Sequence, residues 1–205
     1  MNEGTQEKHS FSVPQKSEGF LRKLKKWQIW LENSKTLHRD FKRYIRQHIV
    51  RKIESSVSLS KIHMDKSYHN LDFVNFTVQN QANINKRIDD ETYYDWVIVI
   101  SYYAMYHAAM ALLYKLGYKA GTHLATICVL CKECLGKTLE KKDIENISVI
   151  LELSEEEIKE MGRAKERRER ASYSGSVSFE KHLAEMTLDD ARKFINKIAV
   201  IIEES

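Results

Sequence analysis

Proline is almost absent from this chain: Pro14 is the single one among 205 residues, and only seven glycines accompany it. Proline and glycine form most tight turns, and a sheet-rich chain of this length needs many of them. Apolar residues also recur every three or four positions over long stretches, as they do on one face of a helix. The composition therefore predicts an all-α fold, an antiparallel bundle of about five helices.

Basic residues are concentrated toward the N-terminus. Residues 20–52 hold eleven Lys or Arg against two acidic residues, a net charge of +9, whereas the whole chain carries +4. We divide the chain into a disordered polar tail over 1–17, a basic helical arm over 18–57 and the bundle over 58–205. The arm's apolar stripe, from Phe20 to Ile53, fits one helix or two helices broken near Asn33.

Cap and stop signals divide the bundle into helices. The predicted helices are 58–79, 91–116, 123–135, 143–151, 154–172 and 178–203, with a polar loop over 79–90. Thr122 should cap the third of these, and Ser154 begins a capping box. Leu59, Ile62, His69, Phe73 and Phe76 follow helical spacing in the first helix, and the last should bury Leu183, Met186, Ala191, Phe194, Ile198 and Ile202.

The arm combines cations with aromatic rings. Its cations include Lys25, Lys26, Arg39, Lys42, Arg43 and Arg46, and its rings are Trp27, Trp30, Phe41 and Tyr44. Such a mixture can hold phosphates and stack on bases of a nucleic acid. The rings also follow the apolar stripe, so packing against the bundle or a second subunit explains them equally well.

Other features exclude several classes. The longest apolar stretch, near Trp96–Leu116, is interrupted by polar residues, and the N-terminus has no apolar signal core, so we expect a cytoplasmic protein without a membrane span. Cys128, Cys131 and Cys134 lack the fourth cysteine of an iron–sulfur motif and fit the apolar side of a helix. We therefore predict core thiols, no metal site and no cofactor.

The segment from Trp96 to Gly117 carries a family resemblance. Ser101, Tyr102, Tyr103, Ala104, Met105, Tyr106, His107, Ala108 and Ala109, followed by Gly117, Tyr118, Thr122 and His123, resemble the second helix and next loop of HEPN domains. HEPN domains are small helical bundles associated with RNA cleavage, nucleotide binding and toxin–antitoxin pairs. His107 alone indicates a core histidine, hydrogen-bonded to Tyr103 one turn away.

The resemblance implies a site on the fourth helix. HEPN ribonucleases carry Arg-x4-6-His there, and two subunits bring these residues together at the scissile phosphate. Here Arg168 is followed after four residues by Tyr173 instead of histidine. Tyrosine, whose ordinary pKa is near 10, is a poor general base at neutral pH. From periodicity alone, Arg168 could instead pack its stem at the bundle edge while its charge reaches solvent.

The resulting hypothesis is a homodimer that binds nucleotide or RNA phosphate without cleaving it. Arg168 and Tyr173 are its central residues, with Arg167, Arg170, Tyr103 and His107 around them. Toxin–antitoxin pairing, or a small nucleotidyltransferase as partner, belongs to this hypothesis. The alternatives are a metal-independent endoribonuclease that uses Arg168 with a displaced histidine, and an interaction scaffold without a ligand.

Overall fold

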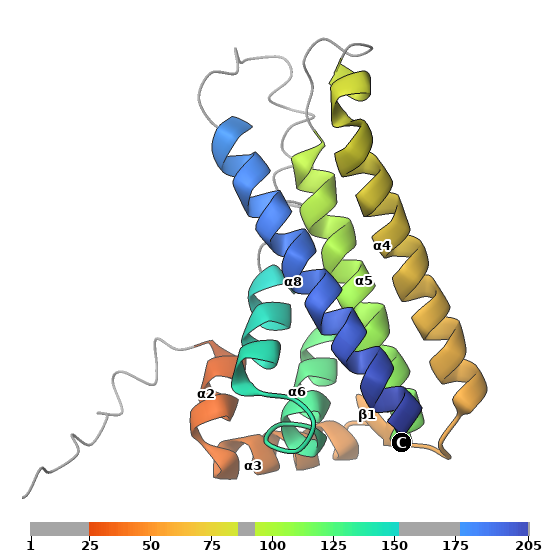
Figure 1. Cartoon of the computed structure of the whole chain (residues 1–205). Coiled ribbons are helices and arrows are strands. Elements are labelled where there is room, and N and C mark those ends of the chain that lie inside the picture. The colour runs from red at the N-terminus through yellow and green to blue at the C-terminus, as the bar shows by residue number, and fades with distance from the viewer. Residues whose placement is uncertain (1–24, 86–92, 152–176, 205) are drawn as a thin grey trace, which may run out of the picture.

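A computed structural model describes residues 25–85, 93–151 and 177–204 of the chain. These residues form an all-α bundle, as predicted (Figure 1). The helices are α2 (Lys26–Glu32), α3 (Ser34–Arg46), α4 (Val57–Asn85), α5 (Tyr94–Lys115), α6 (His123–Glu133) and α8 (Val177–Glu204), and residues 141–151 are also helical. The predicted helix 154–172, with its capping box at Ser154, lies outside the described residues.

The central element is α5, which packs against α4 and α8 along its length (Figure 1). Alanines at 104, 108, 109 and 111 are all fully buried on it. Small side chains allow neighbouring helices to approach closely, and the buried Ser67 hydroxyl of α4 donates a 2.7 Å hydrogen bond to the Ala104 carbonyl. By length and composition α5 would also suit a membrane span, but 72% of its apolar stretch is buried, as in a core helix.

A two-stranded antiparallel sheet joins the arm to the bundle. Strands β1 (Val50–Lys52) and β2 (Tyr118–Ala120) pair Val50 with Ala120. The predicted helical stripe to Ile53 was therefore wrong: α3 ends at Arg46, and His48 takes a left-handed φ of 55° that ends the helical path. Short strands carry little periodic signal, which explains why their pairing was missed.

Gly117 fixes the turn between α5 and β2. Its φ is +78°, and a Cβ there would lie 2.9 Å from the Ile53 carbonyl oxygen. The amide of the same residue, Ile53, donates a 2.9 Å hydrogen bond to the Gly117 carbonyl oxygen. The predicted stop of the second helix at Gly117 thus has a steric reason, because only glycine combines this φ with so close a neighbour.

The arm contributes to the main core. Trp27, Trp30, Leu37, Phe41 and Tyr44 are buried in the same apolar cluster as α5 and α6. Asn33 separates α2 from α3 and accepts a hydrogen bond from the Thr36 amide at 2.9 Å. Of the two predictions for the arm, one continuous helix or two helices broken near Asn33, the second is therefore correct for the described residues. The four aromatic residues of the arm that the structure describes are therefore core residues.

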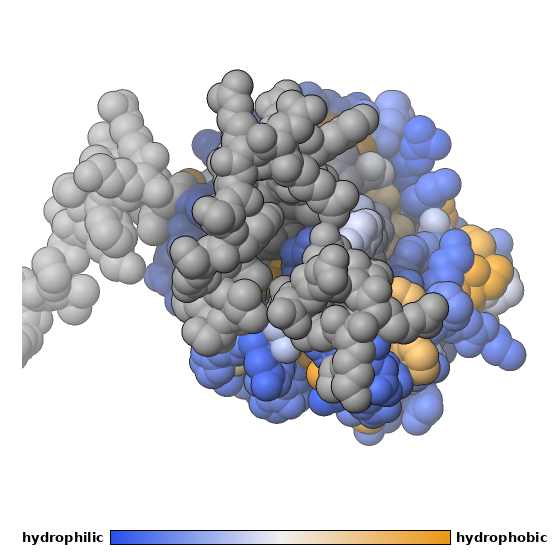
Figure 2. All heavy atoms as spheres, turned by 90° about the horizontal axis from the view of Figure 1, so that it is seen from above, coloured by the Kyte–Doolittle hydropathy of each residue, from blue (hydrophilic) through white to orange (hydrophobic). Residues whose placement is uncertain are grey.

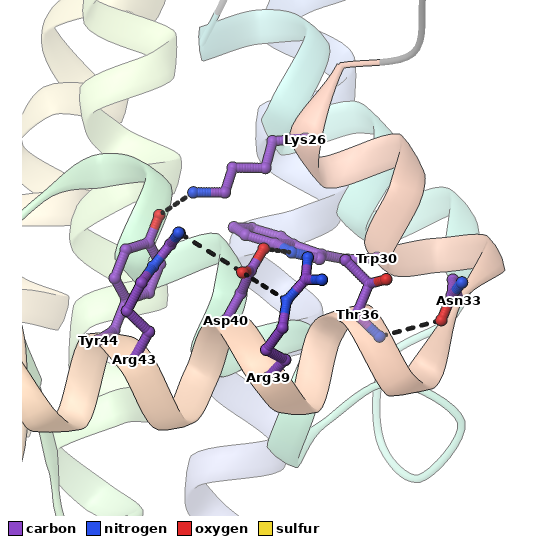
Figure 3. Close-up of polar contacts among 8 residues, drawn as sticks. All are labelled: Lys26, Trp30, Asn33, Thr36, Arg39, Asp40, Arg43 and Tyr44. Atoms are coloured by element: carbon purple, nitrogen blue, oxygen red, sulfur yellow. Dashed lines mark hydrogen bonds and ion pairs between the residues drawn. The ribbon is translucent and has the colours of Figure 1, made fainter. Parts of the chain in front are cut away.

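Asp40 organises the polar contacts between α2 and α3 of the arm (Figure 3). Its carboxylate, in a residue only 3% exposed, accepts a 3.0 Å hydrogen bond from Trp30 Nε1. The guanidinium groups of Arg39 and Arg43 lie 3.6 and 3.5 Å from the same carboxylate. Opposite charges and a donor thus compensate the burial of this acid, and they fix α2 against α3.

The first bundle helix departs from prediction in length and orientation. It continues to Asn85, within the range predicted as a loop, and Thr77 and Asn80 donate side-chain hydrogen bonds to carbonyls one turn earlier. The core-facing side of α4 is formed by Ser60, Met64, Ser67 and Val74, whereas the apolar residues that defined its predicted stripe face outward. The surface in Figure 2 is mostly hydrophilic, with apolar atoms at the edge where α4 lies.

The last helix agrees with prediction except at one position. Ala191, Phe194 and Ile198 are buried, while Leu183 and Ile202 are partly buried against the core. Met186, predicted to face inward, is 50% exposed. Thr187, next to it, takes the buried position and donates to the Leu183 carbonyl. Apolar character therefore predicted the buried side of this helix and failed only at Met186.

Replacing Asp40 tests the contact between α2 and α3. Asp40→Ala leaves buried Trp30 Nε1 without its acceptor, so we expect the free energy of unfolding to fall by about 2 to 3 kcal/mol. Urea denaturation at pH 7 measures the change. Glu54→Ala removes a carboxylate from an exposed position after β1 and should change stability by less than about 0.5 kcal/mol. Equal effects of the two substitutions would contradict this role of Asp40.

Candidate functional site

Seven aromatic rings from three helices form a continuous cluster along α5, from its middle to its C-terminal end. We call it the histidine–tyrosine cluster. Its members are His63 of α4, Tyr102, Tyr103, Tyr106, His107 and Tyr114 of α5, and His123 at the start of α6. The five α5 members lie on one side of that helix. Rings on this side contact His63 of α4 and His123 of α6.

Two histidines of the cluster form a pair. The Nδ1 atoms of His63 and His107 are 3.1 Å apart, which requires one ring to donate and the other to accept. Burial, reinforced by His63, Lys66 and His123, lowers the pKa of His107 to about 4. Burial and Lys66 also lower the pKa of His63. Both rings are therefore neutral at pH 7 and contribute no positive charge.

The partner of His107 differs from prediction. The sequence suggested a hydrogen bond to Tyr103, one turn away on the same helix. Among the described contacts, the hydrogen bond of His107 is instead to His63, which lies 44 residues earlier in the sequence. A His on another helix has no local sequence signal, so His63 could be found only after α4 and α5 were placed together.

The second half of the cluster surrounds His123. Its ring lies 4.3 Å from Tyr106 and 6.1 Å from Tyr103, between ring centroids. Thr122 caps α6 by accepting from the Ala125 amide at 3.1 Å, as predicted, and this fixes where His123 begins the helix. Burial raises the pKa of Tyr106. Tyr103 is the most exposed of the seven rings at 37%, so the cluster reaches solvent there.

The remaining residues predicted for this site cannot be placed beside the cluster. Arg167, Arg168, Arg170 and Tyr173 lie outside the described residues. Of the predicted set, the structure describes Tyr103 and His107, which lie on the same side of α5 but make separate contacts, with His123 and His63 respectively.

The cations of the arm divide into two groups. Lys26 donates to the Tyr44 hydroxyl at 2.9 Å, and Arg39 and Arg43 lie beside Asp40. Lys25, Lys42 and Arg46 are exposed on the outside of the arm. Because the aromatic rings are buried, a nucleic acid could contact the arm only through its surface charges.

The three cysteines are core residues. All are buried on or directly after α6, and burial raises the pKa of Cys128 to about 12 and that of Cys134 to about 11. Burial raises the pKa of Cys131 as well. Metal binding and nucleophilic reactions use the thiolate, so these protonated thiols are suited to packing.

By its fold the chain is an all-α bundle domain organised around one apolar central helix. The family model of the HEPN domain matches residues 80–202, more than half of the chain. A UPF0332 protein of Archaeoglobus fulgidus is 33% identical over 99 residues, which cover 47% of this chain and 66% of that protein. The match thus spans just under two thirds of the relative's length. The chain belongs to the HEPN domain family, which associates it broadly with nucleotides or RNA.

The neutral histidine pair predicts a pH dependence of stability. Unfolded histidine titrates near 6.5, whereas folded His107 titrates near 4. The unfolded chain therefore binds more protons between these values, so this stabilisation is complete above pH 6.5 and is lost toward pH 4. Allowing for solvent screening at a half-buried site, we expect a loss of about 2 kcal/mol.

His107→Gln should reduce this pH dependence, and His38→Gln supplies the control. His38 is exposed on α3, so the same substitution there should leave the slope unchanged. Urea denaturation at pH 7 and pH 4.5 compares the two variants with the unmodified protein. Identical slopes for all three would show that folding does not lower the pKa of His107.

Proposed function

We propose that this protein is a homodimeric HEPN module that binds a nucleotide or RNA phosphate without cutting it. The observation that carries the proposal is Tyr173, which follows Arg168 where HEPN ribonucleases have histidine, in a chain that belongs to this family. Arg168, with Arg167 and Arg170, supplies positive charge for a phosphate, and the Tyr173 hydroxyl supplies a hydrogen bond.

The histidine–tyrosine cluster supports the binding role. Tyr103, at the solvent edge of the cluster, offers a ring face or edge to a base, and aromatic stacking tolerates any base. His107 is neutral, so it can donate or accept a hydrogen bond but adds no charge. A base near Tyr103 and a phosphate near the arginines form one coherent site in this proposal.

The same observations disfavour a nuclease. In-line attack by a ribose hydroxyl needs a general base as well as stabilisation of the phosphate charge. An imidazole with a pKa of about 4, already paired with His63, is a weak base at neutral pH. Arg168 can stabilise the phosphate charge, but it cannot act as the general base. The proposal therefore favours binding within a paired system, such as a toxin–antitoxin or nucleotidyltransferase pair, over cleavage by this chain.

Binding and cleavage are tested on the same protein. We expect purified full-length chain to bind a labelled single-stranded RNA or ATP in fluorescence anisotropy and to leave the RNA intact on a denaturing gel. Arg168→Ala should weaken binding at least tenfold with unchanged circular dichroism, since it removes the central phosphate contact. Tyr103→Leu should weaken binding a few-fold through lost stacking. Rapid RNA cleavage that disappears in Tyr173→Phe would overturn the proposal.

The arm is tested by charge substitution because its helices belong to the core. Lys42→Gln with Arg46→Gln removes two exposed cations of the arm without touching its buried rings. If the arm contacts RNA backbone, the slope of log affinity against log salt should fall by about 1.4 for a single-stranded ligand. Unchanged slope and affinity would assign the arm to packing alone. Lys137→Gln with Lys142→Gln, two exposed cations elsewhere, is the matched control.

A further inference from the structure

The outward side of α4 carries an uncovered apolar surface. Leu59, Ile62, Phe73 and Phe76 are 38%, 47%, 51% and 62% exposed. Figure 2 shows apolar atoms at the edge of the molecule on which α4 stands in Figure 1. Scattered exposed apolar residues are ordinary, but a row of them along one helix indicates a contact surface.

The spacing of these residues is that of a coiled coil. Positions 59, 62, 66, 69, 73 and 76 are all exposed and alternate steps of three and four residues. This heptad pattern is separate from the core-facing side of α4, which Ser60, Met64, Ser67 and Val74 occupy. A helix with one buried side and a second heptad face is arranged to contact another helix. We call the outward row, Leu59, Ile62, Lys66, His69, Phe73 and Phe76, the α4 seam.

We propose that the α4 seam pairs in antiparallel orientation with the α4 seam of a second copy of this chain. The seam is symmetric about its midpoint, so a two-fold axis there sets Leu59 opposite Phe76 and Ile62 opposite Phe73. Each large ring thus meets a smaller aliphatic side chain, as interdigitated helix packing requires. The two-fold pairing is self-complementary, which is the condition for an isologous contact.

Separation of the two Lys66 side chains favours the antiparallel orientation. Lys66 would meet His69 of the second copy, and Asp65 and Asp72, both exposed, lie four and three residues from His69. The cation is therefore bordered by carboxylates of the opposite helix. A parallel pair would instead bring the two copies of Lys66 together at the same level, which is unfavourable.

No residue of the seam belongs to the phosphate site, so this pairing goes beyond the proposed function. It adds a contact distinct from the fourth-helix pairing that the HEPN resemblance implies. Loss of seam pairing with retained nucleotide binding, or the reverse, would separate the two proposals.

Cysteine cross-linking tests the orientation. Full-length Ile62→Cys and Phe73→Cys are prepared separately and in a mixture, and each sample is oxidised. The native cysteines are buried and do not compete. We expect a disulfide in the mixture and little in either variant alone, because equivalent positions would be about 16 Å apart along an antiparallel pair, beyond the reach of about 7 Å between Cα atoms. Cross-linking of each variant with itself would overturn the antiparallel pairing, and no cross-link in any sample would overturn the seam.

Charge reversal at exposed Lys66, which also helps to lower the pKa of His63 and of His107, gives a second test, with association as its measurement. Lys66→Glu should raise the dissociation constant of the seam contact at least tenfold in sedimentation equilibrium, and adding Asp65→Lys and Asp72→Lys should restore association. Lys61→Glu makes the same charge change on an exposed position of α4 outside the seam and should have little effect. Thermal unfolding confirms that each variant is folded. Equal masses for the unmodified protein and Lys66→Glu across the concentration range would overturn the proposal.

Discussion

Burial of α5 is the constraint on which the rest of the structure depends. Its alanines allow α4 and α8 to approach its backbone, and Ser67 of α4 donates directly to a carbonyl of α5. Close approach then sets His63 beside His107. The neutral state of this pair follows from the same burial, because the apolar surroundings disfavour a charged ring. Packing and site chemistry thus have one cause.

The arm combines core side chains with exposed positive charge. Its tryptophans and Phe41 complete the core, and Asp40 joins α2 to α3 through Trp30. The HEPN match begins at residue 80, yet the apolar core of the described residues extends back to Trp27. Surface cations such as Lys42 remain outside this core. Loss of the whole arm would therefore remove core side chains together with charge, and only point substitutions can separate the two.

Local signals in the sequence predicted the elements well and their partners poorly. The cap at Thr122, the stop at Gly117 and the break at Asn33 each depend on a few adjacent residues, and the structure confirms them. The β1–β2 pairing and the contact between His63 and His107 join segments far apart in sequence. In α4 two apolar patterns coexist, and the bulkier one faces outward because the smaller residues allow closer contact with α5. Side-chain size alone could not identify the core side.

The charge of the histidine–tyrosine cluster bears on how the proposed phosphate site would work. The three histidines near α5 lie among tyrosines, and the two that form the pair are neutral at pH 7. A bound phosphate carries at least one negative charge, and removing it from water without a counterion is costly. On the proposal above, that charge must be met by arginines such as Arg168, while the cluster supplies aromatic surface and neutral hydrogen bonds. On that proposal, the cluster and the arginines together suit recognition of a base and a phosphate.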